Sequence, residues 1–290
     1  MGQNKPKQTQ SACRLSTGPA PVRINGAMEL IDTHCHLSFD ELAADVDAVI
    51  ARSKSAGVTG WITVGTDPEH NKKCLELAAR FENMYAAVGL HPHDAKLLNA
   101  RLLDELKETA AHPAVVAIGE TGLDFHYNLS SPDDQLRALV AQLEIAADLN
   151  LPVIIHCRDA FDQVVDVLDK HRHPRTKVVF HCFSGSPEQA RLLVDKGFYI
   201  SFTGVITFKN AQKTRQAAVA VPAERLMLET DCPYMSPEPM RKQRVNEPAL
   251  LVHTAARLAQ LKAMTLPDLA DTLTRTTRTF FALPANREHG

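Results

Sequence analysis

The sequence predicts an α/β protein with the fold of a (β/α)8 TIM barrel, and two observations carry this prediction. Short apolar runs alternate along the chain with longer segments of helical periodicity, a pattern typical of parallel β/α units. Histidines and carboxylates stand at the ends of several runs, and the carboxyl ends of parallel strands are where α/β folds bind ligands. These residues are His34, His36, Glu120, His156, His181 and Asp231.

The spacing of the six residues favours a closed barrel over an open sheet. His36 precedes Glu120 by 84 residues, which is three steps of 28, and Glu120 precedes His156 by 36. His181 follows His156 by 25 residues, and Asp231 follows after a further 50. One β/α unit takes roughly 25–35 residues, so the set falls on units 1, 4, 5, 6 and 8 of about eight. An open sheet would hold these strand ends apart, whereas a barrel gathers them around one mouth.

Turn and cap residues divide the chain into the elements of such a barrel. Gly57 ends the first helix, Pro113 lies just beyond the third, and Pro132 suits the first turn of the fourth. Strands are predicted at residues 30–33, 61–64, 85–88, 115–120, 153–155, 178–180, 198–202 and 226–230. Helices are predicted at 40–56, 69–80, 101–111, 132–150, from 159 to about 171, from about 187 to 196, 209–220, after 246–248, and at 266–281.

Three further segments complete this prediction. Residues 121–131 contain glycine and asparagine turn signals and are predicted to form a loop over the barrel mouth. The segment 233–245 is rich in proline, and the last helix is expected to cover one end of the barrel. The barrel domain is predicted to span 29–285, and residues 1–28 to form a disordered tail.

Composition limits the classes of function. The net charge of −2 excludes a general attraction to nucleic acid, so binding a polyanion would need a local positive field such as that of metal ions. No run of 18 apolar residues is present, so we expect no membrane association. The tail lacks the apolar core of a secretory signal. We expect a monomeric cytoplasmic protein.

The six cysteines are expected to be reduced, as in a cytoplasmic protein. None forms a C-x-x-C pair, which argues against a zinc ribbon or a thioredoxin-like site. Cys35, Cys157, Cys182 and Cys232 each follow a candidate ligand. Strand side chains alternate between the two faces, so these four thiols are predicted to point outward into the helix layer. The alternative is that these thiols bind a soft metal ion, which would require them to point into the barrel instead.

The six strand-end residues are candidate ligands for one or two divalent ions of magnesium, zinc or manganese. His34 and His36 are two residues apart on one strand, so both imidazoles point to the same side. We hypothesise that one metal contacts His34, His36, Glu120 and Asp231 and that a second contacts Glu120, His156 and His181. Glu120 bridges the two ions, and Asp231 also accepts a proton from the attacking water. Glu120 and Asp231 are therefore the candidate catalytic residues.

Other polar residues near the predicted mouth are candidates for substrate binding. Arg158 is expected to hold a phosphate, with an ion pair to Asp159 or another loop acid as the alternative. His91 is expected to hydrogen-bond substrate phosphate or metal-bound water, and His93 is the weaker candidate. Weaker candidates for base stacking or phosphate contact are His126, Tyr127, Phe183, Phe208, Lys209 and Tyr234.

Two acidic residues lie one layer below the candidate ligands in the predicted barrel. Asp32 has the same strand parity as His34, and Glu229 the same as Asp231. For each carboxylate, a hydrogen bond to a ligand histidine and a buried salt bridge deeper in the barrel remain open.

These residues lie in stretches that resemble the TatD family of metal-dependent deoxyribonucleases, within the amidohydrolase-like TIM barrels. The resemblance implies hydrolysis of phosphodiester bonds with divalent metal at the six strand-end residues, by a 3′–5′ exonuclease on DNA or, in some members, RNA. It also implies a role in DNA repair or turnover. The matching stretches are 31–37, 89–93, 119–124, 152–159, 181–185, 197–209 and 228–234.

Two positions depart from the family pattern. Cys232 stands where the family usually has serine or alanine, a conservative change. The loop 239–246 lacks the usual glycine, so we expect the substrate fit on that side to differ from the family pattern, and Arg241, Lys242 and Arg244 can meet a nucleic-acid backbone there.

Two other functions remain open. One is an amidohydrolase acting on a small amide, lactone or phosphoester. Many such enzymes bridge their metals with a modified lysine on the fourth strand, and Glu120 in that place favours phosphoester chemistry. The other is a barrel that binds nucleic acid without turnover, which the complete set of six candidate ligands argues against.

Overall fold

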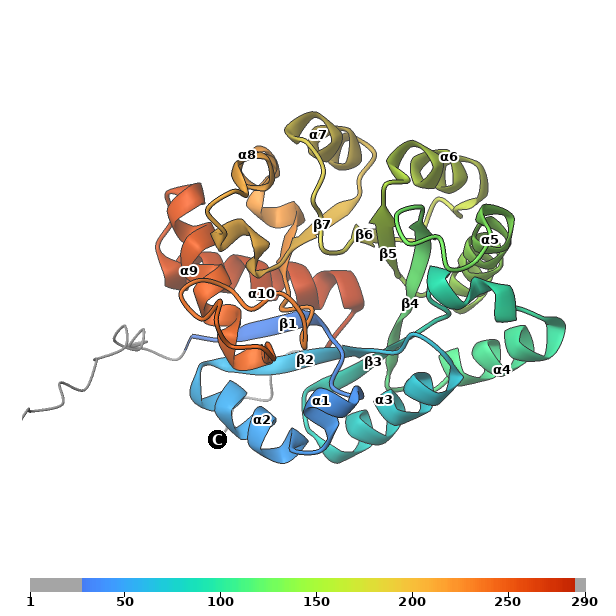
Figure 1. The fold of residues 1–290 in the computed structure, drawn as a ribbon, viewed down its shortest axis with the longest axis horizontal. Helices are drawn as coiled ribbons and strands as arrows, with labels where there is room; N and C mark the ends of the chain where they lie inside the picture. Colours follow the sequence, from blue (N-terminus) through green and yellow to red (C-terminus); the bar gives the residue numbers. More distant parts are fainter. Residues whose placement is uncertain (1–27, 285–290) are drawn as a thin grey trace, which may run out of the picture.

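Eight parallel strands in a single sheet form the centre of the molecule. The computed structural model describes residues 28–284, so the predicted tail lies, apart from Met28, outside the described residues. Figure 1 shows the strands gathered at the centre with the helices around them. In sheet order, each strand pairing with the next, they are β1 (Leu30–Cys35), β2 (Val58–Val64), β3 (Met84–Val88), β4 (Val115–Asp124), β5 (Val153–Arg158), β6 (Val178–Phe180), β7 (Tyr199–Phe202) and β8 (Leu226–Leu228). The predicted barrel is confirmed.

The sheet closes where the chain beyond β8 meets β1. The Asp231 amide donates a hydrogen bond to the His34 carbonyl at 2.9 Å, and the His36 amide donates one to the Cys232 carbonyl at 2.9 Å. These bonds place His34, His36 and Asp231 side by side at the carboxyl end of the barrel. Backbone pairing therefore joins residues almost 200 positions apart in the sequence into one site.

The helices alternate with the strands as the periodicity predicts, with one difference at the start. The predicted helix 40–56 is divided into α1 (Asp40–Ala43) and α2 (Val46–Ser55), because Asp45 leaves the helical conformation with φ −134° and ψ 32°. The remaining helices are α3 (Pro68–Arg80), α4 (Ala100–Ala110), α5 (Pro132–Leu149), α6 (Phe161–His171), α7 (Pro187–Asp195), α8 (Gln212–Ala220), α9 (Leu251–Lys262) and α10 (Leu266–Phe281), with short 3-10 turns η1 (Pro92–Leu97), η2 (Gly204–Thr207), η3 (Ala223–Arg225) and η4 (Pro248–Leu250).

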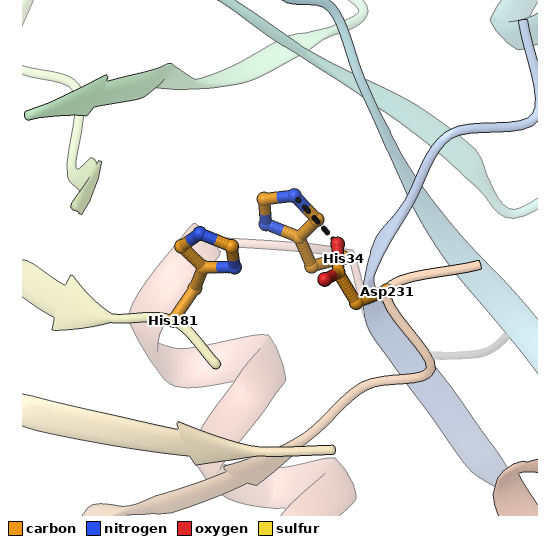
Figure 2. Close-up of side chains that lie close together, drawn as sticks. All are labelled: His34, His181 and Asp231. Atoms are coloured by element: carbon orange, nitrogen blue, oxygen red, sulfur yellow. Dashed lines mark ion pairs between the residues drawn. The ribbon is translucent and has the colours of Figure 1, made fainter. Parts of the chain in front are cut away.

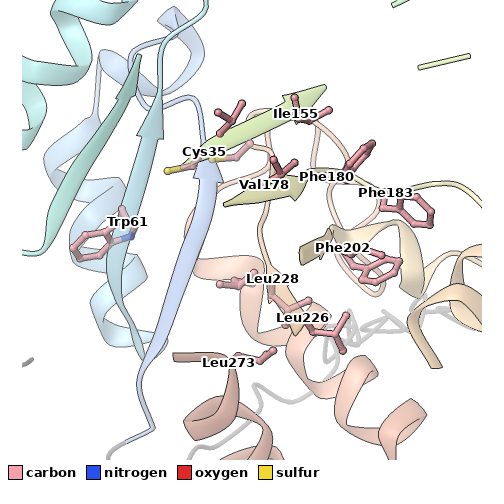
Figure 3. Close-up of a cluster of buried hydrophobic side chains, with 14 of the residues drawn as sticks. Cys35, Trp61, Ile155, Val178, Phe180, Phe183, Phe202, Leu226, Leu228 and Leu273 are labelled. Atoms are coloured by element: carbon pink, nitrogen blue, oxygen red, sulfur yellow. The ribbon is translucent and has the colours of Figure 1, made fainter. Parts of the chain in front are cut away.

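Apolar side chains form two layers. The larger lies between the strands and the helices and includes Trp61, Phe180 and Phe202 (Figure 3). The smaller fills the barrel below the mouth with strand residues such as Ile62 and Ile154, which pack against Phe280 and Phe281 of α10. α10 therefore closes the amino-terminal end of the barrel, as predicted, and leaves the opposite end open for ligands.

β4 is longer than predicted, and the residues expected to start a loop belong to the strand. Thr121, Gly122, Leu123 and Asp124 pair with residues 155–158 of β5. Gly122 has φ +149°, and a Cβ on it would lie 1.9 Å from the His156 carbonyl oxygen. The glycine is therefore a site of close strand approach rather than the turn that the sequence indicated. The loop over the mouth begins at Phe125.

The Asp67 side chain caps the amino terminus of α3 by accepting hydrogen bonds from the amides of Glu69 at 2.9 Å and His70 at 3.0 Å. Replacing Asp67 with alanine should lower the free energy of unfolding by about 0.5–2 kcal/mol, because two helix-end donors lose their acceptor. Urea denaturation measures this change. The Glu76→Ala variant, on the exposed face of the same helix, is the matched control and should change stability by less than about 0.5 kcal/mol.

The stability contributed by this cap should depend on pH in the acid range. Burial opposes ionisation of Asp67, but the hydrogen bonds from His70 outweigh it and lower the carboxyl pKa below 3.8. A carboxyl whose folded pKa is depressed contributes stability above its unfolded pKa and loses it as the pH falls through the folded pKa. The difference between Asp67→Ala and wild type should therefore shrink below about pH 4. An unchanged difference at acid pH would contradict this assignment of the cap.

Candidate metal centre

The six candidate ligands all lie at the carboxyl end of the barrel. His34 is in β1 with His36 just beyond it, Glu120 is in β4, and His156 is in β5. His181 directly follows β6, and Asp231 lies three residues beyond β8. Except for the half-buried His156, the six are buried. All but His34 line a mouth cavity of about 780 Å³. The sequence thus located the site correctly, and the roles of its residues as ligands remain a prediction.

Four of these side chains converge at the distances that a small divalent ion requires. His34 Nε2 and His36 Nε2 lie 3.2 Å apart. Glu120 Oε2 lies 3.4 Å from His34 Nε2, and Asp231 Oδ1 lies 3.4 Å from His36 Nε2. Ligand atoms around a tetrahedral zinc ion with bonds of 2.0–2.1 Å are about 3.3 Å from one another. Both the donor types and their spacing therefore fit one divalent ion.

Glu120 faces two groups of histidines with its two oxygens. Oε2 is directed at the pair on the β1 side, whereas Oε1 lies 2.6 Å from His156 Nδ1 and 2.7 Å from His181 Nε2. Oε1 also lies 3.4 Å from His91 Nε2. This is the arrangement expected of a carboxylate that bridges two cations.

Two contacts of these side chains go beyond the predicted division into two ligand sets. His181 stacks on His34, with ring centroids 4.0 Å apart, and lies beside Asp231 (Figure 2). The triads whose ligand atoms converge within 4.8 Å are His34, His181 and Asp231; His34, His36 and Glu120; and His91, Glu120 and His156. The predicted division therefore stays a prediction, and the geometry adds that His181 also lies near the first group and that His91 lies near the second. His91 follows β3 in a turn, so the alternation of side chains along a strand could not predict the direction of its imidazole.

The charges of the site suit a bound cation. Burial opposes ionisation of Glu120, but the charges of His181 and His91 and hydrogen bonds from His156 and His181 lower its pKa well below 4.5. Burial also opposes ionisation of Asp231, and the hydrogen bond with His36 and charges of neighbouring histidines lower its pKa below 3.8. Both carboxyls are therefore ionised at neutral pH, as metal ligation requires.

The two deeper carboxylates have different partners. Glu229 Oε1 lies 3.6 Å from His181 Nδ1 and accepts a hydrogen bond from the Cys182 amide at 2.5 Å, so it orients the chain around a candidate ligand. Asp32 accepts hydrogen bonds from the amide and hydroxyl of Thr230 at 2.9 and 2.6 Å. Burial raises the pKa of Asp32 to about 7. Asp32 also accepts a hydrogen bond of 3.4 Å from the backbone amide of the candidate ligand His34, and among residues 28–284 it forms no salt bridge, so the first of the two alternatives is the one observed.

Arg158 is available for substrate at the rim of the cavity. It is exposed, and its guanidinium lies 4.6 Å from the centroid of the Tyr127 ring. The alternative ion pair with Asp159 is wrong, because Asp159 pairs instead with His126 at 3.0 Å. The buried His91 lines the same cavity, where desolvation lowers its pKa.

Asp124 is a site residue that sequence reasoning missed. Its Oδ2 lies 2.9 Å from His93 Nε2 and 3.2 Å from His156 Nε2. Its Oδ1 accepts hydrogen bonds from the His126 and Tyr127 amides. Asp124 thus connects a candidate ligand to the loop over the mouth. The sequence could have indicated this, because Asp124 is four residues after Glu120 and would point to the same side of one strand. The predicted strand ended at Glu120, so this relation was not used.

Only two of the four cysteines that follow candidate ligands point outward into the helix layer as predicted. Cys35 and Cys232 are buried behind the barrel wall as expected, whereas Cys157 and Cys182 line the mouth cavity. Cys182 lies beyond the end of β6 with φ +46°, so strand alternation no longer sets its direction. Cys157 is the residue before the last of β5, where the strand reaches the open rim. No cysteine joins the candidate ligand clusters of the described residues.

A parallel barrel with convergent histidines and carboxylates at its open end defines a class of metal-binding (β/α)8 proteins. The chain belongs to the TatD related DNase family, whose family model matches residues 31–282. Along residues 28–284, no helix combines the length and the apolar character needed to cross a bilayer.

Similar proteins are known from sequence and from structure. A protein of Bacillus subtilis named uncharacterized metal-dependent hydrolase YabD is 39% identical over 254 residues, covering 88% of this chain and 99% of the relative. The 3′-5′ ssDNA/RNA exonuclease TatD of Escherichia coli K12 is 38% identical over 258 residues, with the same coverage. The crystal structure of the TatD homologue YJJV from Escherichia coli K12 is 35% identical, with a TM-score of 0.81, covering 88% of this chain and 98% of that one.

Proposed function

We propose that this protein is a divalent-metal-dependent hydrolase that cleaves phosphodiester bonds in single-stranded DNA or RNA from the 3′ end. The observation that carries the proposal is Glu120, whose two oxygens face two separate groups of histidines at the mouth of the barrel. The names of relatives that match nearly the full barrel support it, since they include a metal-dependent hydrolase and an ssDNA/RNA exonuclease.

Metal ions would be held by His34, His36, Glu120, His156, His181 and Asp231, and would supply a water of lowered pKa and charge neutralisation at the phosphoryl oxygens. The protein contributes the geometry around them. Asp231 is an ionised carboxylate at the rim of the cavity and accepts a proton from the attacking water at Oδ1 or Oδ2. Glu120 holds its neighbouring histidines in place through both oxygens.

Two further side chains bind the substrate backbone. Arg158 is exposed at the rim, where its guanidinium can hold two phosphate oxygens. His91 is buried in the same cavity, with its Nε2 3.4 Å from Glu120 Oε1, and hydrogen-bonds substrate phosphate or metal-bound water. Together they place the scissile phosphate over Glu120.

We also propose that the barrel works as a monomer in the cytoplasm. All candidate ligands come from one chain, so the site needs no partner copy. Cys35, Cys74, Cys157, Cys182 and Cys232 carry free thiols, the state that a reducing compartment maintains. Light scattering at micromolar concentration tests the assembly, and a mass near that of a dimer would contradict this part of the proposal.

The choice of substrate is tested by comparing phosphodiesters with the substrates of related barrels. In the presence of divalent metal, the protein should shorten 5′-labelled single-stranded DNA and RNA into a ladder, cleave a nitrophenyl phosphodiester, and leave lactones and dihydroorotate intact. A 3′-labelled strand should release its label as the first product. Turnover confined to the lactone or amide panel would establish the amidohydrolase alternative instead.

A further inference from the structure

We infer that Tyr127 and Tyr234 stack against the two bases that flank the scissile phosphate, one on each side of the metal centre. This inference rests on the proposed cleavage of nucleic acid and assigns a role that neither the family nor its ligand set specifies. The two residues are 54% and 51% exposed. Among the exposed large apolar side chains of residues 28–284, only these two line the mouth cavity.

The two tyrosines stand on opposite sides of the barrel mouth. Tyr127 lies in the segment after β4, and Tyr234 lies in the segment after β8. In a closed ring of eight strands in the order β1 to β8, β4 and β8 are diametrically opposed. Glu120 of β4 and Asp231 beyond β8 lie between them. A phosphate at the metal centre therefore has one aromatic ring on each side, as a dinucleotide step requires.

Tyr127 is anchored to the metal centre through Asp124. The Tyr127 amide donates a hydrogen bond of 2.8 Å to Asp124 Oδ1, and the other oxygen of that carboxylate contacts His156. The ring also packs edge-on against His93, with centroids 5.5 Å apart. Arg158 lies against the same ring. Bases stack on both tyrosine rings and guanidinium planes, so this corner offers an aromatic surface with a positive charge beside it.

Tyr234 is anchored to the opposite side of the site. Its amide donates a hydrogen bond of 3.0 Å to the Asp231 carbonyl. Its own carbonyl accepts one of 2.6 Å from Asn246 Nδ2, and this buried amide also donates to the Thr230 carbonyl at 3.0 Å. Asn246 thus fixes Tyr234 relative to the candidate ligand Asp231. The backbone that carries this exposed ring is therefore fixed beside the metal site, which places the ring to contact substrate rather than to fill a core.

The substrate class follows from this arrangement. A base reaches a tyrosine ring at the mouth only if it is unpaired, so the two flanking nucleotides must be single-stranded. Stacking tolerates all four bases because each has a π face. The two rings therefore select unpaired strands with little preference for sequence.

Abasic substrates separate stacking from other effects of the two rings. The substrates are 5′-labelled single-stranded oligonucleotides with an ordinary 3′ end, and matched strands in which the terminal or the penultimate nucleotide is abasic. Each is cleaved by wild type, Tyr127→Ala, Tyr234→Ala, the corresponding phenylalanine variants, and Leu129→Ala. Leu129 is the matched control, because it is 56% exposed in the same loop as Tyr127 but does not line the cavity. Thermal unfolding confirms that every variant is folded.

Each alanine variant should lose about 5- to 150-fold in kcat/KM on the ordinary strand, the factor for one lost base–aromatic stack. Its loss should vanish on the strand that lacks the base it contacts, and the phenylalanine variants and Leu129→Ala should keep wild-type rates. Equal losses on ordinary and abasic strands, or no loss on either, would overturn the inference while leaving the proposed function intact. A wild-type protein that cleaves no strand with metal present would instead overturn the proposed function and the inference with it.

Discussion

The Asp231→Asn variant should lose about 10²- to 10⁴-fold in kcat for phosphodiester cleavage while it still binds divalent metal and single-stranded DNA. Asparagine keeps the shape of the buried side chain and one oxygen near His34 and His36, but it removes the negative charge and the proton acceptor. Cleavage of end-labelled DNA measures kcat. Calorimetry and fluorescence anisotropy measure the binding of metal and DNA.

The control for this variant is Asp45→Asn, which neutralises an exposed carboxylate 3.8 Å from Arg52, far from the mouth. It should keep the wild-type kcat. Metal-dependent turnover that disappears in Asp231→Asn, with binding retained, would also reject the alternative of a barrel that only binds nucleic acid. Wild-type turnover by Asp231→Asn would show that this carboxylate is dispensable and would contradict its catalytic role.

The Glu120→Gln variant should lose at least as much activity as Asp231→Asn and should also destabilise the metal-free protein. Glu120 is the carboxylate shared by both groups of histidines, so the substitution removes charge from both at once. The ion pair between Glu120 and His181 is buried at 2.7 Å, where burial opposes protonation of His181 but the charge and hydrogen bond of Glu120 outweigh it and raise the His181 pKa well above 6.5. Breaking a buried pair by neutralising one partner costs about 3–5 kcal/mol.

Urea denaturation of metal-free protein measures this stability, and titration calorimetry measures the number of bound ions. Glu144→Gln, on the exposed face of α5, is the matched control and should leave both unchanged. A Glu120→Gln variant that binds the wild-type number of ions with wild-type affinity would show that this carboxylate does not bridge the groups.

The fold and the location of the site could be predicted because they follow from the periodicity of apolar residues and from the spacing of the polar residues at the strand ends. Alternating apolar runs and helical segments define β/α units, and intervals near one unit length place polar strand ends around one mouth. Backbone hydrogen bonds between neighbouring strands then bring these strand ends together, as the bonds between Asp231 and His34 and between His36 and Cys232 illustrate. Each of these rules concerns a short stretch of sequence, and together they suffice because all the strands run in the same direction.

The parts that escaped prediction depend on exceptions to those rules. Gly122 resembles a turn residue in the sequence, yet it marks a strand that passes too close to the His156 carbonyl for any side chain. Because the predicted strand stopped short, Asp124 was assigned to a loop and its contacts with His93 and His156 were missed. Cys182 lies beyond its strand with φ +46°, where the alternation of strand side chains gives no direction, so only the structure could place it at the mouth.

The central claim is that histidines and carboxylates of distant strands hold catalytic cations at one mouth. The direct measurement is cleavage of end-labelled single-stranded DNA and RNA by protein stripped with a chelator and then titrated with magnesium, manganese or zinc. We predict background cleavage by the stripped protein and restored cleavage that saturates at one or two ions per chain. Stripped protein that digests these strands as fast as the replenished form would contradict the account.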